Sequence, residues 1–327
     1  MMNKRLKQGS TFLLAVALTF PLLTLPGAKA ASAIDTGQKC SIEFDISGNS
    51  SELLSASIPV NLYKVASVDE SGNYTVTDAF TGLDLSSVSA DNLDTAAATW
   101  AARAKEAQGK LTDSDGKTVV EPTETVTLQN GRGTATGLKT GLYLVDTPKV
   151  ITPNYTYTFT PYLVSLPTNN YYNNDQTSDD WIYDLTKEYN SAVGLKPEQH
   201  VRYGKLVINK ELEDHNATFG DKATFVFQID ITTPDNKKET RIEELTFDAA
   251  GSHSVTIEKI PAGSHVTVTE VYSGASYELA SAKSQETDII ANPEKKSEVE
   301  FRPAEVSFIN KHDGRTNGGY GVKNNFN

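Results

Sequence analysis

Apolar and polar residues alternate with a period of two through much of the chain, in short runs separated by turn sequences. This alternation is typical of strands that bury one face and expose the other. Turn sequences rich in Gly, Asn, Asp and Ser, such as DESGNY at 69–74 and AAGSH at 249–253, end the runs. We therefore expect a mainly β protein built from sandwich or barrel units.

One stretch, 89–109, has the period of a helix instead. Its apolar positions share one face, and Gly109 stands where the helix would stop. The face consists of Leu93, Ala97, Trp100, Ala104 and Ala107. We expect this helix, placed near 90–108, to be an insertion packed on the first domain.

The strand pattern divides the chain into two units, at 35–190 and 204–313, with a polar linker at 191–203 and a Gly- and Asn-rich flexible tail at 314–327. Each unit is long enough for its own core. Strands of the first unit are expected at 40–46, 58–68, 125–137, 141–147, 155–166 and 180–186. Strands of the second are expected at 205–212, 223–232, 242–248, 253–260, 265–272, 288–291 and 304–311.

The first thirty residues have the features of a secretory signal peptide. Lys4, Arg5 and Lys7 precede the apolar run TFLLAVALTFPLLTLP, and AKA at 28–30 offers small residues for cleavage. No later apolar run approaches the roughly 20 residues of a membrane helix. We expect a secreted or extracellular protein that can associate with the cell surface, with no membrane insertion after cleavage.

Charge and cysteine content narrow the function further. The formal net charge is −12, and loss of residues 1–30 removes four positive charges, which leaves −16. So acidic a chain is repelled by nucleic acid and by anionic membranes. Cys40 is the only cysteine, so no internal disulfide can form, and durability must come from the core, a metal or another crosslink.

Three polar residues fall in phase with apolar faces of the second unit. Lys210, Glu270 and Asn310 each end the apolar row of a strand. The rows are Leu206 and Ile208, Val266 and Val268, and Val306 and Phe308. If these strands lie together, the three side chains meet inside the sandwich.

These three side chains could react with one another. A lysine amine removed from water becomes a neutral nucleophile, and a buried glutamic acid can move protons. The amine of Lys210 could then attack the side-chain amide of Asn310 beside Glu270, release ammonia and leave an isopeptide bond. The alternative is a lysine that extends to water, an asparagine after the last strand and a glutamate at a bulge.

The stretches GKLVINKELE, IPAGSHVTVTEVYSGASYEL and EVSFINK resemble the lysine, glutamate and asparagine strands of Cna-B domains, found in Gram-positive pilins and surface adhesins. The resemblance covers 204–313. It implies an immunoglobulin-like β-sandwich, with Lys210 as nucleophile, Asn310 as acceptor and Glu270 as catalytic acid. The fold class expected is thus two tandem immunoglobulin-like β-sandwiches, with one helical insertion in the first.

The first unit resembles the N-terminal domain of pilin backbone subunits, through IPVNLYKVASV, GLKTGLYLVDT, FTPYLVSLP and DWIYDLT. Lys64 and Asp146 are each in phase with the apolar residues of their strands, as the lysine and the glutamate of the second unit are, which suggests a second crosslink. A lysine that extends to water and an acid at the end of a strand are the alternative. Sortase substrates of this family end in LPxTG, an apolar stretch and basic residues. We expect no such sorting signal in this chain.

These features favour an exported pilin-like or adhesin-like structural protein, stabilised by an autocatalytic Lys–Asn isopeptide bond. It would not be an enzyme and would need no cofactor or metal. Expected partners are other pilin or surface subunits, and a host protein or glycan as ligand. The alternatives are a secreted module that binds a glycan or host protein without a crosslink, and a secreted enzyme whose site the sequence does not reveal.

Overall fold

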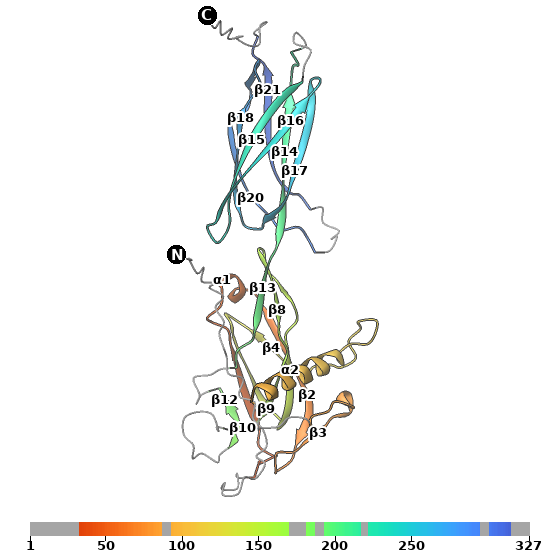
Figure 1. Ribbon diagram of the computed structural model, residues 1–327. Helices are drawn as coiled ribbons and strands as arrows, with labels where there is room; N and C mark the ends of the chain where they lie inside the picture. Colours follow the sequence, from red (N-terminus) through yellow and green to blue (C-terminus); the bar gives the residue numbers. More distant parts are fainter. Residues whose placement is uncertain are drawn as a thin grey trace, which may run out of the picture. The chain divides into compact units, whose positions relative to one another are not determined.

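The computed structural model describes residues 33–86, 93–169, 181–186, 193–216, 222–294 and 301–314. The expected signal peptide and most of the expected tail lie outside these residues. The chain divides into two compact units, one from Met1–Val150 and Tyr157–Glu198, the other from Ile151–Thr156 and Gln199–Asn327. Both units are built mainly of strands (Figure 1), which confirms the expected fold class of tandem β-sandwich units.

The largest sheet of unit 1 is organised around β2, Ile58–Val68. It has the order β3-β2-β6-β9, and β4 also pairs with β2. The eleven residues of β2 suffice for β4 to pair with its first half and β3 with its end. The other strands are β3 (Tyr74–Val76), β4 (Glu124–Leu128), β6 (Gly141–Asp146) and β9 (Tyr162–Leu166).

A second sheet of unit 1 has the order β12-β1-β5, from Asp184–Leu185, Cys40–Asp45 and Arg132–Leu138. The stretch 125–137, expected as one strand, is therefore two strands in two sheets. Asn130 and Gly131, with φ of 51° and 80°, form the turn between β4 and β5. Asn-Gly favours such left-handed turns, so the break was readable in the sequence.

Helix α2, Leu93–Gly109, packs on β6 and β9 of the largest sheet. Trp100, Ala104 and Ala107 are buried there, as the helical period predicted. The side chains of Leu93 and Ala97 lie outside the described part. The expected helical insertion in the first unit is thus present and ends at Gly109.

The remaining elements are short. They are α1 (Ser51–Leu54), η1 (Asp78–Phe80), β10 (Thr168–Asn169) paired with β11 (Trp181–Ile182), and a sheet of order β13-β8-β7 from Pro197–Val201, Tyr155–Phe159 and Val150–Ile151. The stretch 155–166, expected as one strand, is broken between β8 and β9 around Pro161, which has no N–H to donate.

The stretch 191–203, expected as a linker, contains β13 and the first residue of β14. Most side chains of β13 are exposed, so its sequence lacks the apolar alternation that would mark a strand. Its backbone is nevertheless paired in a sheet. Strand pairing without burial explains why the pattern missed it.

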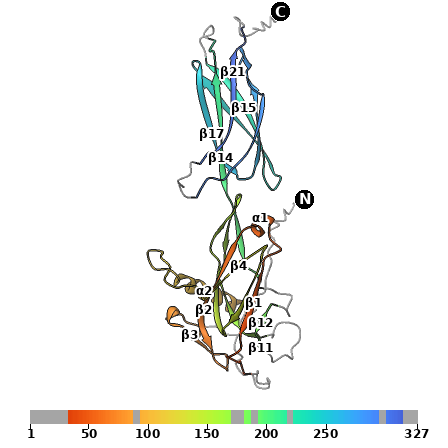
Figure 2. The same cartoon turned by 180° about the vertical axis from the view of Figure 1, so that it is seen from behind.

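Unit 2 is a sandwich of two four-stranded sheets, ordered β17-β14-β21-β19 and β16-β15-β18-β20 (Figures 1 and 2). The strands are β14 (Tyr203–Leu212), β15 (Ala223–Thr232), β16 (Lys238–Phe247), β17 (Gly251–Pro261), β18 (His265–Tyr272), β19 (Tyr277–Leu279), β20 (Ser284–Asp288) and β21 (Ala304–His312). The strand expected at 288–291 is wrong: β20 ends at Asp288, and of the next three residues only Ala291 forms an isolated bridge.

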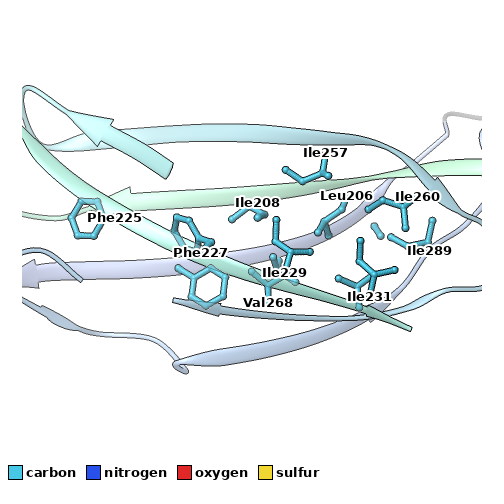
Figure 3. Close-up of a cluster of buried hydrophobic side chains, with 14 of the residues drawn as sticks. Leu206, Ile208, Phe225, Phe227, Ile229, Ile231, Ile257, Ile260, Val268 and Ile289 are labelled. Carbon is cyan, nitrogen blue, oxygen red and sulfur yellow. The ribbon is translucent and has the colours of Figure 1, made fainter. Parts of the chain in front are cut away.

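The core of unit 2 lies between its two sheets (Figure 3), and inward residues alternate with outward ones along β14, β15 and β21. In β15, Phe225, Phe227 and Ile229 point inward and are fully buried. The first strand, β14, lies parallel to the last, β21, from Leu206 opposite Ala304 to Leu212 opposite Asn310. The chain thus begins and ends unit 2 on two neighbouring strands of one sheet.

Two isoleucines on adjacent strands of the same sheet test this core. Ile229→Ala should lower the free energy of unfolding of unit 2 by about 2–5 kcal/mol, because it leaves a cavity in a buried site. Ile242→Ala, at a side chain 58% exposed, should change it by less than about 0.5 kcal/mol. Urea denaturation of both variants measures the difference. Equal losses would contradict the packing described.

Candidate functional site

The three residues that the strand phase singled out meet inside unit 2. Lys210 on β14 and Asn310 on β21 point inward from one sheet, and Glu270 on β18 points toward them from the facing sheet. Their exposed fractions are 1%, 0% and 1%. Charged and amide side chains are rarely buried so completely unless they are paired.

Each of the three side chains contacts the other two. Asn310 Nδ2 donates a hydrogen bond to Glu270 Oε1 over 2.6 Å. Lys210 Nζ donates to Asn310 Oδ1 and lies 3.3 Å from Glu270 Oε2. The amine, the amide and the carboxyl group therefore form a closed triangle.

The strand register produces this triangle. Lys210 lies opposite Phe308, and Asn310 opposite Leu212, so the two side chains are offset by two residues on the same inward face. A long lysine side chain spans that diagonal. In the facing sheet, Glu270 pairs with Phe227, one of the innermost residues of β15.

The amine of Lys210 lies beside an aromatic ring. Its Nζ lies 4.5 Å from the ring centroid of Phe225, which packs edge-on against Phe247. The rings of Phe227 and Phe308 lie 5.2 Å apart. The contact of Phe225 with Lys210 depends on how the two sheets meet, which the strand pattern does not specify.

This environment favours the neutral amine. Burial lowers the pKa of Lys210 below its ordinary 10.5, and the nearby carboxyl group of Glu270 opposes this only in part. Among the described residues, Glu270 Oε2 has no hydrogen-bond partner, and its near neighbour is Lys210 Nζ. The site therefore brings together an amine of lowered pKa, an amide and a carboxyl oxygen.

The structure does not bring Lys64 and Asp146 together. Lys64 on β2 lies opposite Tyr143, whereas Asp146 on β6 lies opposite Asn61, so the two side chains leave opposite faces of the sheet. Asp146 instead accepts a hydrogen bond from Gln108 of α2 over 2.6 Å. Phase within each strand was correct, but only the register between strands decides which side chains meet.

Other chemistry has little support in the described part of the chain. No three His, Cys, Asp or Glu side chains there gather as ligands for a metal ion. The carboxylate of Asp113 accepts backbone hydrogen bonds from Asp115 and Lys117 and stabilises a turn. No described helix is long and apolar enough to cross a bilayer.

A family model described as a domain of unknown function (DUF5979) matches residues 206–313. None of the curated proteins matches the chain.

The similar solved structures include Gram-positive pilins. The Bacillus anthracis TIE protein is 15% identical with a TM-score of 0.29; the match covers 58% of this chain and 28% of that one. The full-length major pilin SpaD of Corynebacterium diphtheriae is 12% identical with a TM-score of 0.25, over 87% of this chain and 100% of that one. The major pilin SpaA of the same organism, described as pointing to a modular pilus assembly with stabilizing isopeptide bonds, is 12% identical with a TM-score of 0.24, over 83% and 100%.

The TM-scores of these matches are too low to carry an argument about family or function. The functional argument rests instead on the buried trio.

The lowered pKa of Lys210 predicts a pH effect on stability. In an Asn310→Ala background, where the amine has no acceptor, the further change Lys210→Met removes the buried amine. The unfolded chain binds the Lys210 proton more tightly than the folded one, so Asn310→Ala should gain stability relative to the double variant as pH rises toward 10.5. Urea denaturation at several pH values measures this. A difference that is flat or falls over that range would contradict the assignment.

Proposed function

We propose that the protein is an exported pilin-like or adhesin-like structural protein of the cell surface, whose unit 2 carries an isopeptide bond between Lys210 and Asn310. The observation that carries the proposal is the mutual contact of Lys210, Glu270 and Asn310 in a site closed to water. Burying a lysine side chain and an amide costs free energy. A protein that keeps the two buried in direct contact therefore has a functional reason to do so.

The reaction follows from these contacts. The neutral amine of Lys210 attacks Cγ of Asn310. Glu270 Oε1, which already accepts a hydrogen bond from the amide nitrogen, stabilises the positive charge that develops on that nitrogen as it takes up a proton. One proton passes from Nζ through the carboxyl group of Glu270 to Nδ2. The Cγ–Nδ2 bond then breaks, ammonia leaves, and a new Nζ–Cγ amide bond remains. The step needs no oxidant, metal or cofactor.

The bond would stabilise unit 2 through the chain topology. It closes a loop across a sequence separation of 100 residues, worth about 4.7 kcal/mol in the chain-entropy model for crosslinks. Because it joins neighbouring first and last strands, a pulling force would pass from β14 to β21 without loading the residues between them.

Such a unit suits a protein that works outside the cell without a disulfide. Its partners are proposed to be other pilin or surface subunits, with a host protein or glycan as a further ligand. The chain turns over no substrate, because the reaction consumes its own side chains once.

Intact mass spectrometry tests the bond. The wild-type chain should be lighter than its sequence mass by one ammonia molecule, and Lys210→Ala and Glu270→Ala should restore the full mass. Lys205→Ala, on the outward face of the same strand, serves as the control and should still lose ammonia. A wild-type chain of unmodified mass would contradict the proposal.

Single-molecule pulling on the two ends of unit 2 tests the mechanical role. Glu270→Ala should release about 100 residues on unfolding, or roughly 350 Å of extra length at ~3.5 Å per residue. The wild-type unit should lack that step, because the bond shields these residues from force. The same step in both proteins would show that no covalent link bears the load.

A further inference from the structure

Part of one edge of β21 is completed mainly by side chains rather than by a strand. β14 pairs with one edge of β21 along its length, but on the other edge β19 covers only Asn310, Lys311 and His312. A strand edge left open presents unpaired N–H and C=O groups. In unit 2 this edge faces the segment 280–285, which leads from β19 in one sheet to β20 in the other.

The carboxamide of Gln285 replaces a neighbouring peptide at this edge. Its Nε2 donates a hydrogen bond to the carbonyl oxygen of Ser307. The backbone N–H of Ser307 donates in turn to Gln285 Oε1 over 3.2 Å. A carboxamide has the donor and the acceptor of a peptide group, so one side chain satisfies both backbone groups of one residue.

Two residues further along β21, both backbone groups of Ile309 bond to the same segment. Ile309 N donates to Ser281 Oγ over 3.1 Å, and Ile309 O accepts from the backbone N–H of Ala280 over 2.8 Å. Residues 307 and 309 are therefore both held, and the pairing then passes to β19 at Lys311. The segment 280–285 acts as a clamp on β21 just before Asn310.

The clamp also holds the strand of Glu270. Gln285 pairs with Val268 of β18, and Glu270 N donates to the carbonyl oxygen of Lys283 over 3.0 Å. One short segment is thus hydrogen-bonded both to β18, in one sheet, and to β21, in the other. Apolar packing between sheets is not directional, whereas hydrogen bonds fix distance and direction.

We propose that Gln285 and Ser281 are positioning residues that set the place of Asn310 relative to Glu270 and so determine how fast the Lys210–Asn310 bond forms. This inference rests on the proposed function. Neither residue touches the reacting atoms; both act through the backbone of β21. A displacement of about 1 Å can slow an intramolecular reaction by about a hundredfold, so a loosened β21 should show first in the rate.

The rate of bond formation tests the proposal. The full chain, recovered unfolded from inclusion bodies and hence unreacted, is refolded by rapid dilution and quenched in acid at times from milliseconds to hours. Intact mass gives the fraction that has lost ammonia, and protease resistance gives the fraction folded. Gln285→Met, which keeps the length of the side chain but not its hydrogen bonds, should fold and lose ammonia about tenfold more slowly than wild type.

Three further variants separate positioning from general stability. Gln285→Glu keeps the acceptor for Ser307 N–H and should give an intermediate rate. Ser281→Ala removes a single hydroxyl group, should slow the reaction about threefold, and decides the question if Gln285→Met fails to fold. Gln228→Met is the matched control. Gln228 lies in the same sheet as Gln285, and its side chain donates a hydrogen bond to Asp230 of its own strand, so the variant should lose ammonia at the wild-type rate.

The outcomes are distinct for the two proposals. Slow reaction in folded Gln285→Met, with a normal rate in Gln228→Met, supports the clamp. Wild-type rates in the folded clamp variants overturn it and leave the crosslink intact. No ammonia loss in the wild-type chain overturns the proposed function itself, and the clamp with it.

Discussion

The parallel pairing of β14 with β21 is the constraint on which the site depends. It makes the first and last strands of unit 2 neighbours and fixes their register, so that Lys210 and Asn310 leave the same inward face two residues apart. The facing sheet then supplies Glu270 from β18. A register shift of one residue would turn one of the two side chains outward, because successive side chains alternate between faces. The proposed chemistry therefore follows from strand pairing as much as from the residues themselves.

The burial that makes the trio costly also favours the proposed reaction. Removing a lysine from water destabilises its charged form, which lowers the pKa of Lys210 and favours the amine that can attack an amide. Contacts with Glu270 and Asn310 offset part of the cost, and the ring of Phe225 lies 4.5 Å from Nζ. In the proposal, a covalent bond ends this conflict by converting a buried amine and a primary amide into one neutral secondary amide.

Much of this arrangement could be predicted from the sequence, because the period of two is a property of single strands. The bounds of β2, β15 and β18 agree with their apolar runs, and the phases of Lys210, Glu270 and Asn310 are as expected. What failed depends on pairing between strands. The exposed strand β13 has no apolar alternation, and Lys64 and Asp146 leave opposite faces of one sheet. The bonds of Gln285 to β21 involve backbone groups, which no side-chain pattern records.

Unit 2 thus combines an apolar core, a polar trio within it and a hydrogen-bonded segment that ties its two sheets together. In the proposal, Lys210 and Asn310 are covalently joined, and tandem mass spectrometry of a tryptic digest would detect that bond. We expect a branched peptide in which the segment containing Lys210 is linked to the segment containing Asn310, with no cleavage after Lys210. Two separate peptides, with cleavage after Lys210 and an unmodified Asn310, would contradict it.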